Sequence, residues 1–241
     1  MLREIVKAFP QADVLYLGDH ARAPYGDRDS EEIRRFTKEA VDWLFTQGCD
    51  EILFACNTAS SVVLPKLNDA RVFGIVEPTR EWLASRRDRY VGLLATNATV
   101  DSGAYTDAVA VEQACPAWSI LIERGDARSD EAKAVVKEDV DRLFVTDSTI
   151  DTIVLACTHY PIFHAYVEQA LGNHLDGRRE ERSVQVVDQG QMLVDWMRAS
   201  GRELVTTTAG VRFCTTGDPE RVASTAEQAF GVPVRFEKVT L

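Results

Sequence analysis

The sequence lacks a long hydrophobic run and an excess of positive charge. None of its apolar stretches reaches the roughly 20 residues that a membrane-spanning helix needs. Lysine and arginine together number 27, against 38 aspartate and glutamate residues, which gives a formal net charge of −11. Nucleic acids and anionic membranes are bound through basic patches, so we expect neither as a partner. The first twenty residues include Arg3, Glu4 and Lys7 without a long apolar block, and we expect no signal peptide.

Cysteine is too sparse for a disulfide scaffold. The chain has five cysteines, an odd number, and no C-x-x-C pair, which favours a reducing cytoplasmic location. A zinc site at Cys157 and His159 is not expected, because no second pair at ligand spacing accompanies them. The sequence also has no G-x-G-x-x-G or Walker motif, so a nucleotide is not indicated.

The order of the expected elements indicates an α/β fold. With 241 residues and 45% hydrophobic content, the chain can form one large domain or two modest α/β domains. Apolar strand candidates alternate with amphipathic helices, which predicts mainly parallel sheets with ligands bound beyond the carboxyl ends of the strands. We expect strands over residues 72–78, 90–99 and 234–241, a helix from about Ser102, and a loop over residues 115–123.

A cysteine motif occurs twice, once in each half of the chain. Residues 51–61, EILFACNTASS, predict a buried strand that ends at Cys56 and turns directly into a helix. Residues 153–161, IVLACTHYP, repeat the pattern, with isoleucine, alanine and cysteine in register and Cys157 at the strand end. A single cysteine of this kind is as readily a packing residue as a functional one. Two thiols on equivalent strand ends favour a functional pair that faces a common cleft.

Small polar residues follow the ends of three strands and offer hydroxyl and amide donors. Such donors suit a small carboxylate ligand, although each loop taken singly is more typical of ordinary helix capping. The residues are Tyr25, Gly26, Asn57, Thr58, Thr96 and Thr99. Beside the second thiol, His159 can carry a charge that acts on Cys157 or on a ligand.

Six motifs together resemble those of a known family. GDHARAPYG, ACNTAS, ATNATVDSGAY, ACPAWSILIE, LACTHYP and TTGDPE follow one another between residues 18 and 220. They resemble the glutamate racemases of the cofactor-independent aspartate/glutamate racemase superfamily. The resemblance implies two pseudo-symmetric α/β domains with mainly parallel sheets and an active site in the cleft between them. The first domain would comprise residues 1–78 and 182–241, and the second residues 79–181.

The resemblance also implies a reaction and its residues. The chain would interconvert L- and D-glutamate without cofactor or metal and supply D-glutamate for peptidoglycan. Cys56 and Cys157 would be the two acid/base thiols, assisted by His159 and Glu123. The substrate would be held by Tyr25, Gly26, Asn57, Thr58, Thr96, Thr99, Thr158 and His159. A homodimer is left open.

The sequence departs from the family pattern at its beginning. The family has a strand and a glycine-rich loop, approximately IGVFDSGVGGLTV, ahead of the segment that corresponds to Leu2–Ile5. That piece is absent from the sequence, and we expect in-frame codons for it upstream of Met1. Two alternatives therefore stand beside the glutamate racemase. One is a catalytically impaired relative that binds a small anion or a protein, and the other is a racemase for aspartate or another amino acid.

Overall fold

Four parallel strands form the sheet that carries the second thiol motif, in the order β5-β4-β6-β7. The computed structural model describes residues 1–86, 89–175, 183–202, 210–230 and 233–241. This upper sheet comprises β4 (Val91–Ala95), β5 (Val111–Ala114), β6 (Thr152–Ala156) and β7 (Gln185–Asp188). In register, Ala95 lies beside both Ala114 and Ala156, so the carboxyl ends of β4, β5 and β6 meet at one edge.

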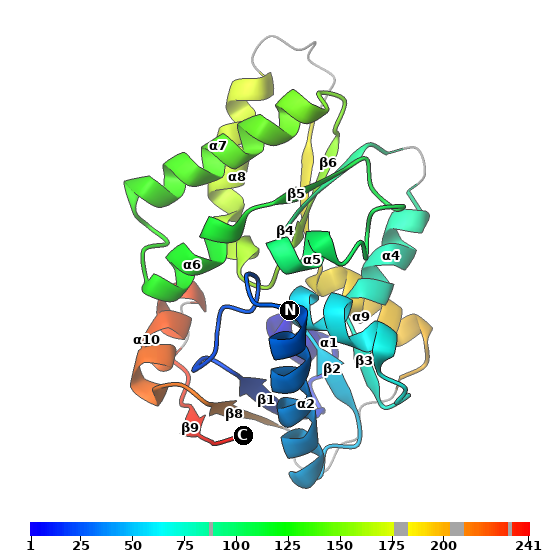
Figure 1. Ribbon diagram of the computed structural model, residues 1–241, viewed down its shortest axis with the longest axis vertical. Coiled ribbons are helices and arrows are strands. Elements are labelled where there is room, and N and C mark those ends of the chain that lie inside the picture. Colours follow the sequence, from blue (N-terminus) through cyan, green and yellow to red (C-terminus); the bar gives the residue numbers. More distant parts are fainter. Residues whose placement is uncertain (87–88, 176–182, 203–209, 231–232) are drawn as a thin grey trace.

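The lower part of the molecule holds two smaller parallel sheets (Figure 1). One has the order β1-β8-β9, formed by β1 (Asp13–Gly18), β8 (Gly210–Thr215) and β9 (Glu237–Lys238). The other pairs β2 (Ile52–Phe54) with β3 (Val72–Gly74). Every strand pairing among the described residues is parallel, as the α/β prediction requires.

Helices cover both faces of the upper sheet. On one face lie α6 (Pro116–Arg124), α7 (Asp130–Thr146), η2 (Tyr160–Phe163) and α8 (His164–Leu175). The alternation of side chains along the strands sends Leu155 into this layer and Val154 into the opposite one. The opposite layer includes α4 (Val76–Ala84), the segment after α5 (Asn97–Asp101), and Met192 of α9 (Gly190–Ala199). The strands of this sheet are therefore apolar on both faces, and they read as continuous hydrophobic runs.

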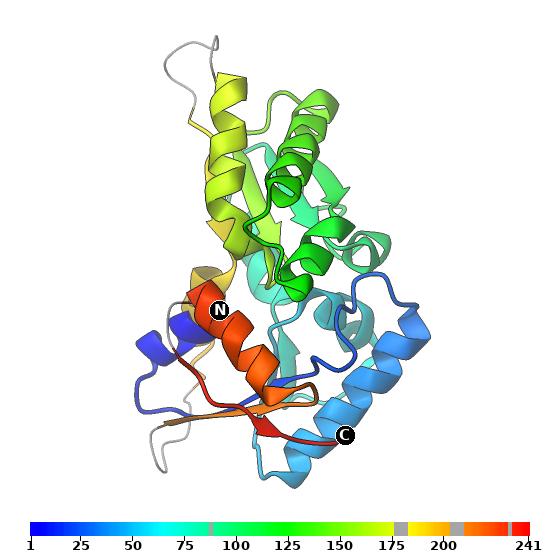
Figure 2. The same ribbon diagram turned by 90° about the vertical axis from the view of Figure 1, so that its left-hand side faces the viewer.

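The lower part has its own helical cover, visible from two directions in Figures 1 and 2. It consists of α1 (Leu2–Ala8), α2 (Ser30–Thr46), α3 (Asn57–Val63), η1 (Leu64–Lys66) and α10 (Pro219–Phe230). The helix α2 begins at Ser30, because the side chain of Asp29 accepts hydrogen bonds from the amides of Glu31 and Glu32. Its buried residues Ile33 and Val41 pack with β2, which fixes the strand that leads to Cys56.

Five expected elements are wrong in extent or type. The strand over residues 90–99 is shortened to β4, Val91–Ala95. The expected loop over residues 115–123 is the helix α6, which starts with Pro116 at its first turn and ends at Gly125, whose φ is +86°. The helix expected from about Ser102 is instead α5, Asn97–Asp101. The strand over residues 72–78 stops at Gly74, because Val76 already begins α4. The final strand is reduced to Glu237–Lys238.

The predicted return from the second domain at residue 182 precedes β7. This strand hydrogen-bonds to β6, with Asp188 beside Leu155, and so it belongs to the upper sheet. By sheet membership the chain returns to the lower part only after Asp188. The polar segment that suggested the crossing, residues 176–183, lies almost wholly outside the described residues.

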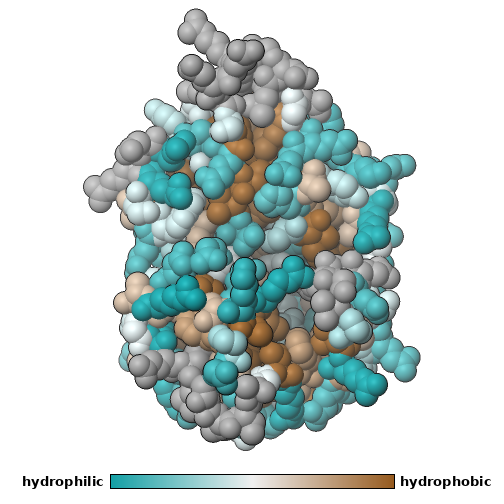
Figure 3. All heavy atoms as spheres, turned by 180° about the vertical axis from the view of Figure 1, so that it is seen from behind, coloured by the Kyte–Doolittle hydropathy of each residue, from teal (hydrophilic) through white to brown (hydrophobic). Residues whose placement is uncertain are grey.

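From behind, hydrophobic side chains gather in an upper and a lower patch with a more hydrophilic belt between them (Figure 3). The belt lies at the level where the upper and lower parts meet. No described helix has the length and hydrophobicity that a membrane crossing demands.

Candidate active site

Cys56 lies at the junction of β2 and α3. Its backbone is extended (φ −73°, ψ 122°), and its Sγ accepts a hydrogen bond from the amide of Ala59 at 3.5 Å, as an N-cap side chain does. Burial raises the pKa of this thiol to about 11, although the amide of Ala59 partly offsets the effect. The charge of Cys157 also raises it, which means that the two sulfurs lie within electrostatic reach of each other. Cys56 is therefore a protonated thiol at neutral pH.

Cys157 lies directly after β6 and is paired with a histidine. His159 Nδ1 is 3.7 Å from the Cys157 Sγ, and His159 Nε2 is 2.8 Å from Glu123 Oε1 on α6. Burial lowers the pKa of His159, but the hydrogen bonds to Cys157 and Glu123 outweigh it and raise the pKa to about 10. His159 is thus an imidazolium at neutral pH, and its positive charge lies beside the Cys157 Sγ. Of the two thiols, Cys157 is the one whose sulfur contacts this cation.

Hydroxyl groups from both sides meet near Cys56. The Thr58 and Thr96 hydroxyls are 2.9 Å apart, and Thr96 is 3.1 Å from Thr99. Gly26 lies beside them, because its carbonyl accepts a hydrogen bond of 2.9 Å from the amide of Ala98, between Thr96 and Thr99 in the chain. A Cβ at Gly26 would lie 2.7 Å from the Thr96 Cβ, so glycine is needed for this close approach. Four of the predicted ligand residues therefore form one cluster.

Thr158 lies on the Cys157 side. Its side chain is exposed, and it lines a small cavity together with Cys157, Pro161 and Gln189. The position suits a group that contacts the same ligand as the second thiol.

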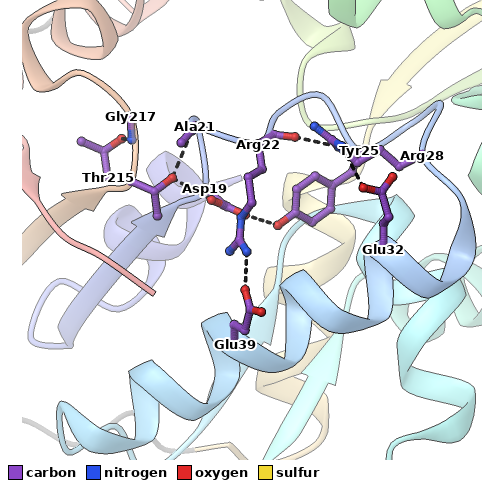
Figure 4. A network of polar contacts seen from close by, with 10 residues as sticks. Asp19, Ala21, Arg22, Tyr25, Arg28, Glu32, Glu39, Thr215 and Gly217 are labelled. Carbon is purple, nitrogen blue, oxygen red and sulfur yellow. Dashed lines mark hydrogen bonds and ion pairs between the residues drawn. The ribbon is translucent and has the colours of Figure 1, made fainter.

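The Tyr25 hydroxyl has a protein partner of its own (Figure 4). It donates to the Asp19 carboxylate, which also pairs with Arg22 Nε at 2.7 Å and accepts from the Thr216 hydroxyl at 2.6 Å. Burial and the bond to Asp19 raise the pKa of Tyr25. Arg22 continues to Glu39 on α2 and so ties the loop to the helix. This network holds the shape of the loop that carries Gly26.

Asn57 is buried in a network that the sequence does not predict. Its Nδ2 donates to Gln189 Oε1 at 2.6 Å, and its Oδ1 accepts from the Tyr105 hydroxyl at 2.8 Å. Gln189 also contacts Thr79. No spacing in the sequence signals these contacts, because residues 57 and 189 are joined only by the fold. Among the described residues, no group of three or more histidine, cysteine or acidic side chains is arranged to hold a metal ion.

The whole arrangement matches a known family. A family model described as Asp/Glu/Hydantoin racemase matches residues 1–197. The chain belongs to this family. Both thiols, their loops and the entire upper sheet fall within the matched region.

Individual relatives extend the match beyond residue 197. A curated glutamate racemase of Gloeobacter violaceus is 36% identical over 240 residues, which cover 94% of this chain and 86% of the relative. A glutamate racemase of Bacillus cereus is 34% identical over 252 residues, with coverage of 98% and 90%. Among solved structures, glutamate racemase from Thermus thermophilus, in complex with beta-chloro-D-alanine, is 33% identical with a TM-score of 0.79. It covers 100% of this chain, and 91% of its own length is matched. The α/β fold with mainly parallel sheets is thus the fold of these enzymes.

Proposed function

We propose that the protein is an amino-acid racemase that interconverts L- and D-glutamate without a cofactor. The observation that carries this proposal is the pair of sulfurs, a half-buried Cys56 thiol that is protonated at neutral pH and a buried Cys157 whose Sγ lies beside an imidazolium. Inverting a stereocentre requires one group that removes the Cα proton and another that returns a proton to the opposite face. The names of the relatives, glutamate racemases throughout the matches described above, support glutamate as the substrate.

The proton transfers require one sulfur as a thiolate and the other as a thiol. In one direction the Cys157 thiolate takes the proton from Cα, and the bonding pair stays on carbon as a planar carbanion. The Cys56 thiol then gives its proton to the other face, which leaves a Cys56 thiolate and a Cys157 thiol. The opposite enantiomer is bound by this second form, and the same steps run in reverse. Each turnover moves one proton onto one sulfur and one proton off the other, so atoms and charge balance.

The surrounding groups lower the free energy of the carbanion. His159 carries a positive charge held by Glu123, and it stabilises negative charge on Cys157. The hydroxyls of Thr58, Thr96, Thr99 and Thr158 would bind the substrate carboxylates. Neutralising the carboxylate beside Cα reduces the repulsion that opposes a second negative charge, and exclusion of water strengthens these interactions. Tyr25 would act through the loop, since its hydroxyl is bound to Asp19.

Hydrogen exchange at Cα tests the proposal. The protein is incubated with L-glutamate in deuterated water, and both the Cα proton signal and the optical rotation are followed. We expect deuterium at Cα together with loss of rotation, because the Cys56 thiol exchanges with solvent before it donates. Tight binding of glutamate without exchange would contradict the enzyme and support the anion binder. Parallel incubations with aspartate and other amino acids distinguish a glutamate racemase from a racemase with another substrate.

The proposal includes an organisation and a location. We infer two domains, the first comprising residues 1–78 with the segment after β7, and the second running from residue 79 through β7. We also infer a cytoplasmic enzyme that supplies D-glutamate for peptidoglycan. Size-exclusion chromatography with light scattering would show whether the homodimer considered from the sequence forms.

A further inference from the structure

Four uncharged polar side chains form a buried network where the upper and lower parts of the molecule meet. Asn57 starts α3, Thr79 lies in α4, Tyr105 follows α5, and Gln189 precedes α9. Their exposed fractions are 2%, 0%, 0% and 3%, respectively. Asn57 Nδ2 and Gln189 Oε1 are 2.6 Å apart, and Gln189 Nε2 is 3.2 Å from Asn57 Oδ1, so the two amides bind each other in both directions.

The donors and acceptors in this network fix which atom donates each hydrogen bond. The Thr79 hydroxyl donates its single proton to the Ile75 carbonyl at 2.8 Å, so the atom that faces Thr79 must be a donor. That donor is Gln189 Nε2, at 2.8 Å from the Thr79 Oγ1. The second Nε2 hydrogen points between Asn57 Oδ1 at 3.2 Å and the Tyr105 hydroxyl at 3.3 Å. Gln189 therefore uses both Nε2 hydrogens and its Oε1 acceptor within the network.

The network touches both thiol-bearing segments. Asn57 is the residue directly after Cys56, so its side chain fixes the first turn of α3. On the other side, Gln189 follows β7, whose Asp188 lies in register with Leu155 of β6, and Gln189 lines the same small cavity as Cys157. Gln189 is thus hydrogen-bonded to the residue after Cys56 and follows the strand beside the one that leads to Cys157, so its position links the two sulfurs.

We propose that Gln189 is a positioning residue that holds the two thiols in register across the substrate. This inference rests on the proposed racemase function. Gln189 acts through Asn57 and the end of β7, and it takes no proton from the substrate. Because the reacting atoms must be aligned on opposite faces of one carbon, a displacement of about 1 Å between the sulfurs is enough to reduce turnover about 100-fold.

Two substitutions separate positioning from general destabilisation. Gln189→Leu keeps the size of the side chain and removes its hydrogen bonds. Gln189→Glu keeps the shape, but the ionised carboxylate has no donor for Thr79 or Asn57, and protonation restores one. The matched control is Gln191→Leu, two residues further on, whose side chain is exposed and bonded only to Asp195 among the described contacts.

For Gln189→Leu we expect kcat to fall about 100-fold in both directions, with KM changed less than about threefold. Gln191→Leu should match the unsubstituted protein. For Gln189→Glu, the ratio of its kcat to that of the unsubstituted protein should fall about tenfold as the pH rises through the titration of the buried carboxyl. Circular dichroism and thermal melting check the fold. If Gln189→Leu does not fold, the pH dependence of the Gln189→Glu ratio tests the positioning role by itself.

A readout independent of turnover completes the test. The alkylation rate of each cysteine by iodoacetamide is measured by peptide mass spectrometry. In folded Gln189 variants we expect Cys56 to react several-fold faster, while Cys49, also half-buried but outside the network, keeps its rate. A Gln189→Leu protein with kcat within about twofold of the unsubstituted protein, a pH-independent ratio for Gln189→Glu, or unchanged Cys56 alkylation would overturn the inference. If the unsubstituted protein does not racemise glutamate, the proposed function fails instead. The alkylation rates then still test whether Gln189 holds Cys56 in place.

Discussion

Replacing Glu123 by glutamine removes one charge and leaves the shape of the site unchanged. Glu123 Oε1 is 2.8 Å from His159 Nε2, and the opposite ring nitrogen is 3.7 Å from the Cys157 Sγ. With a neutral amide at position 123, the imidazolium loses one of the two partners that raise its pKa. The ring stays charged at neutral pH, but without the carboxylate it is held less firmly beside the Cys157 Sγ, where its charge stabilises the negative charge that develops in the reaction.

The size of the effect follows from the pKa of His159. Its rise from 6.5 to about 10 corresponds to a preference of about 5 kcal/mol for the charged ring, shared between Cys157 and Glu123. The side chains of His159 and Glu123 are 28% and 27% exposed, and solvent screening reduces the share of Glu123 to about 1–2 kcal/mol. Because each 1.4 kcal/mol corresponds to a factor of ten in rate, we expect kcat to fall about 5- to 30-fold for Glu123→Gln.

The assay follows racemisation from both enantiomers at neutral pH, together with the pH dependence of Cys157 alkylation. In the Glu123→Gln protein the pH profile of Cys157 alkylation should change, since the imidazolium beside its Sγ is no longer held by a carboxylate. Glu131→Gln, on the exposed start of α7, serves as the control. Unchanged turnover together with an unchanged alkylation profile of Cys157 would refute the role assigned to the ion pair.

Three further predictions concern stability and substrate affinity. Because the folded-state pKa of His159 lies above its unfolded value, its stabilising effect is fully present below about pH 6.5 and is lost as the pH rises through about 10. The Tm difference between unsubstituted protein and His159→Gln should therefore shrink over that range. Gly26→Ala, which forces a Cβ to within 2.7 Å of the Thr96 Cβ, should raise KM about tenfold in a substrate titration, and an unchanged KM would contradict the cluster. Trp118→Phe leaves the buried Asp139 carboxylate without its 2.8 Å indole donor, so urea unfolding should show a loss of about 1–3 kcal/mol.

Much of the fold could be predicted from the sequence because its strands are short apolar runs between capping signals. The strands β4 and β6 are buried on both faces, and Asp29 marks the start of α2. The sequence does not predict the helix α6, because Pro116 and the small residues around it are typical of a loop. Proline is, however, also suited to the first turn of a helix. The strand predicted over residues 90–99 extends too far, because Thr96 is already the N-cap residue of the helix α5.

The site was predictable where the sequence repeats itself and hidden where only the fold brings residues together. The matching contexts of Cys56 and Cys157 identified both thiols, and the spacing of two residues placed His159 beside the second. Gln189 and Tyr105 carried no such signal, because an isolated glutamine or tyrosine is ordinary in any soluble domain. Their meeting with Asn57 depends on how the two parts of the chain are packed.

The account depends most on two thiols that act on opposite faces of one carbon, and single cysteine substitutions test this most directly. Cys56→Ser, Cys157→Ser and the control Cys49→Ser are each compared with the unsubstituted protein for racemisation and Cα deuterium exchange, with circular dichroism as a check of the fold. We expect both site variants to lose racemisation by at least about 1,000-fold with the fold intact, and the control to stay active. Full racemisation by either site variant would contradict the two-thiol mechanism.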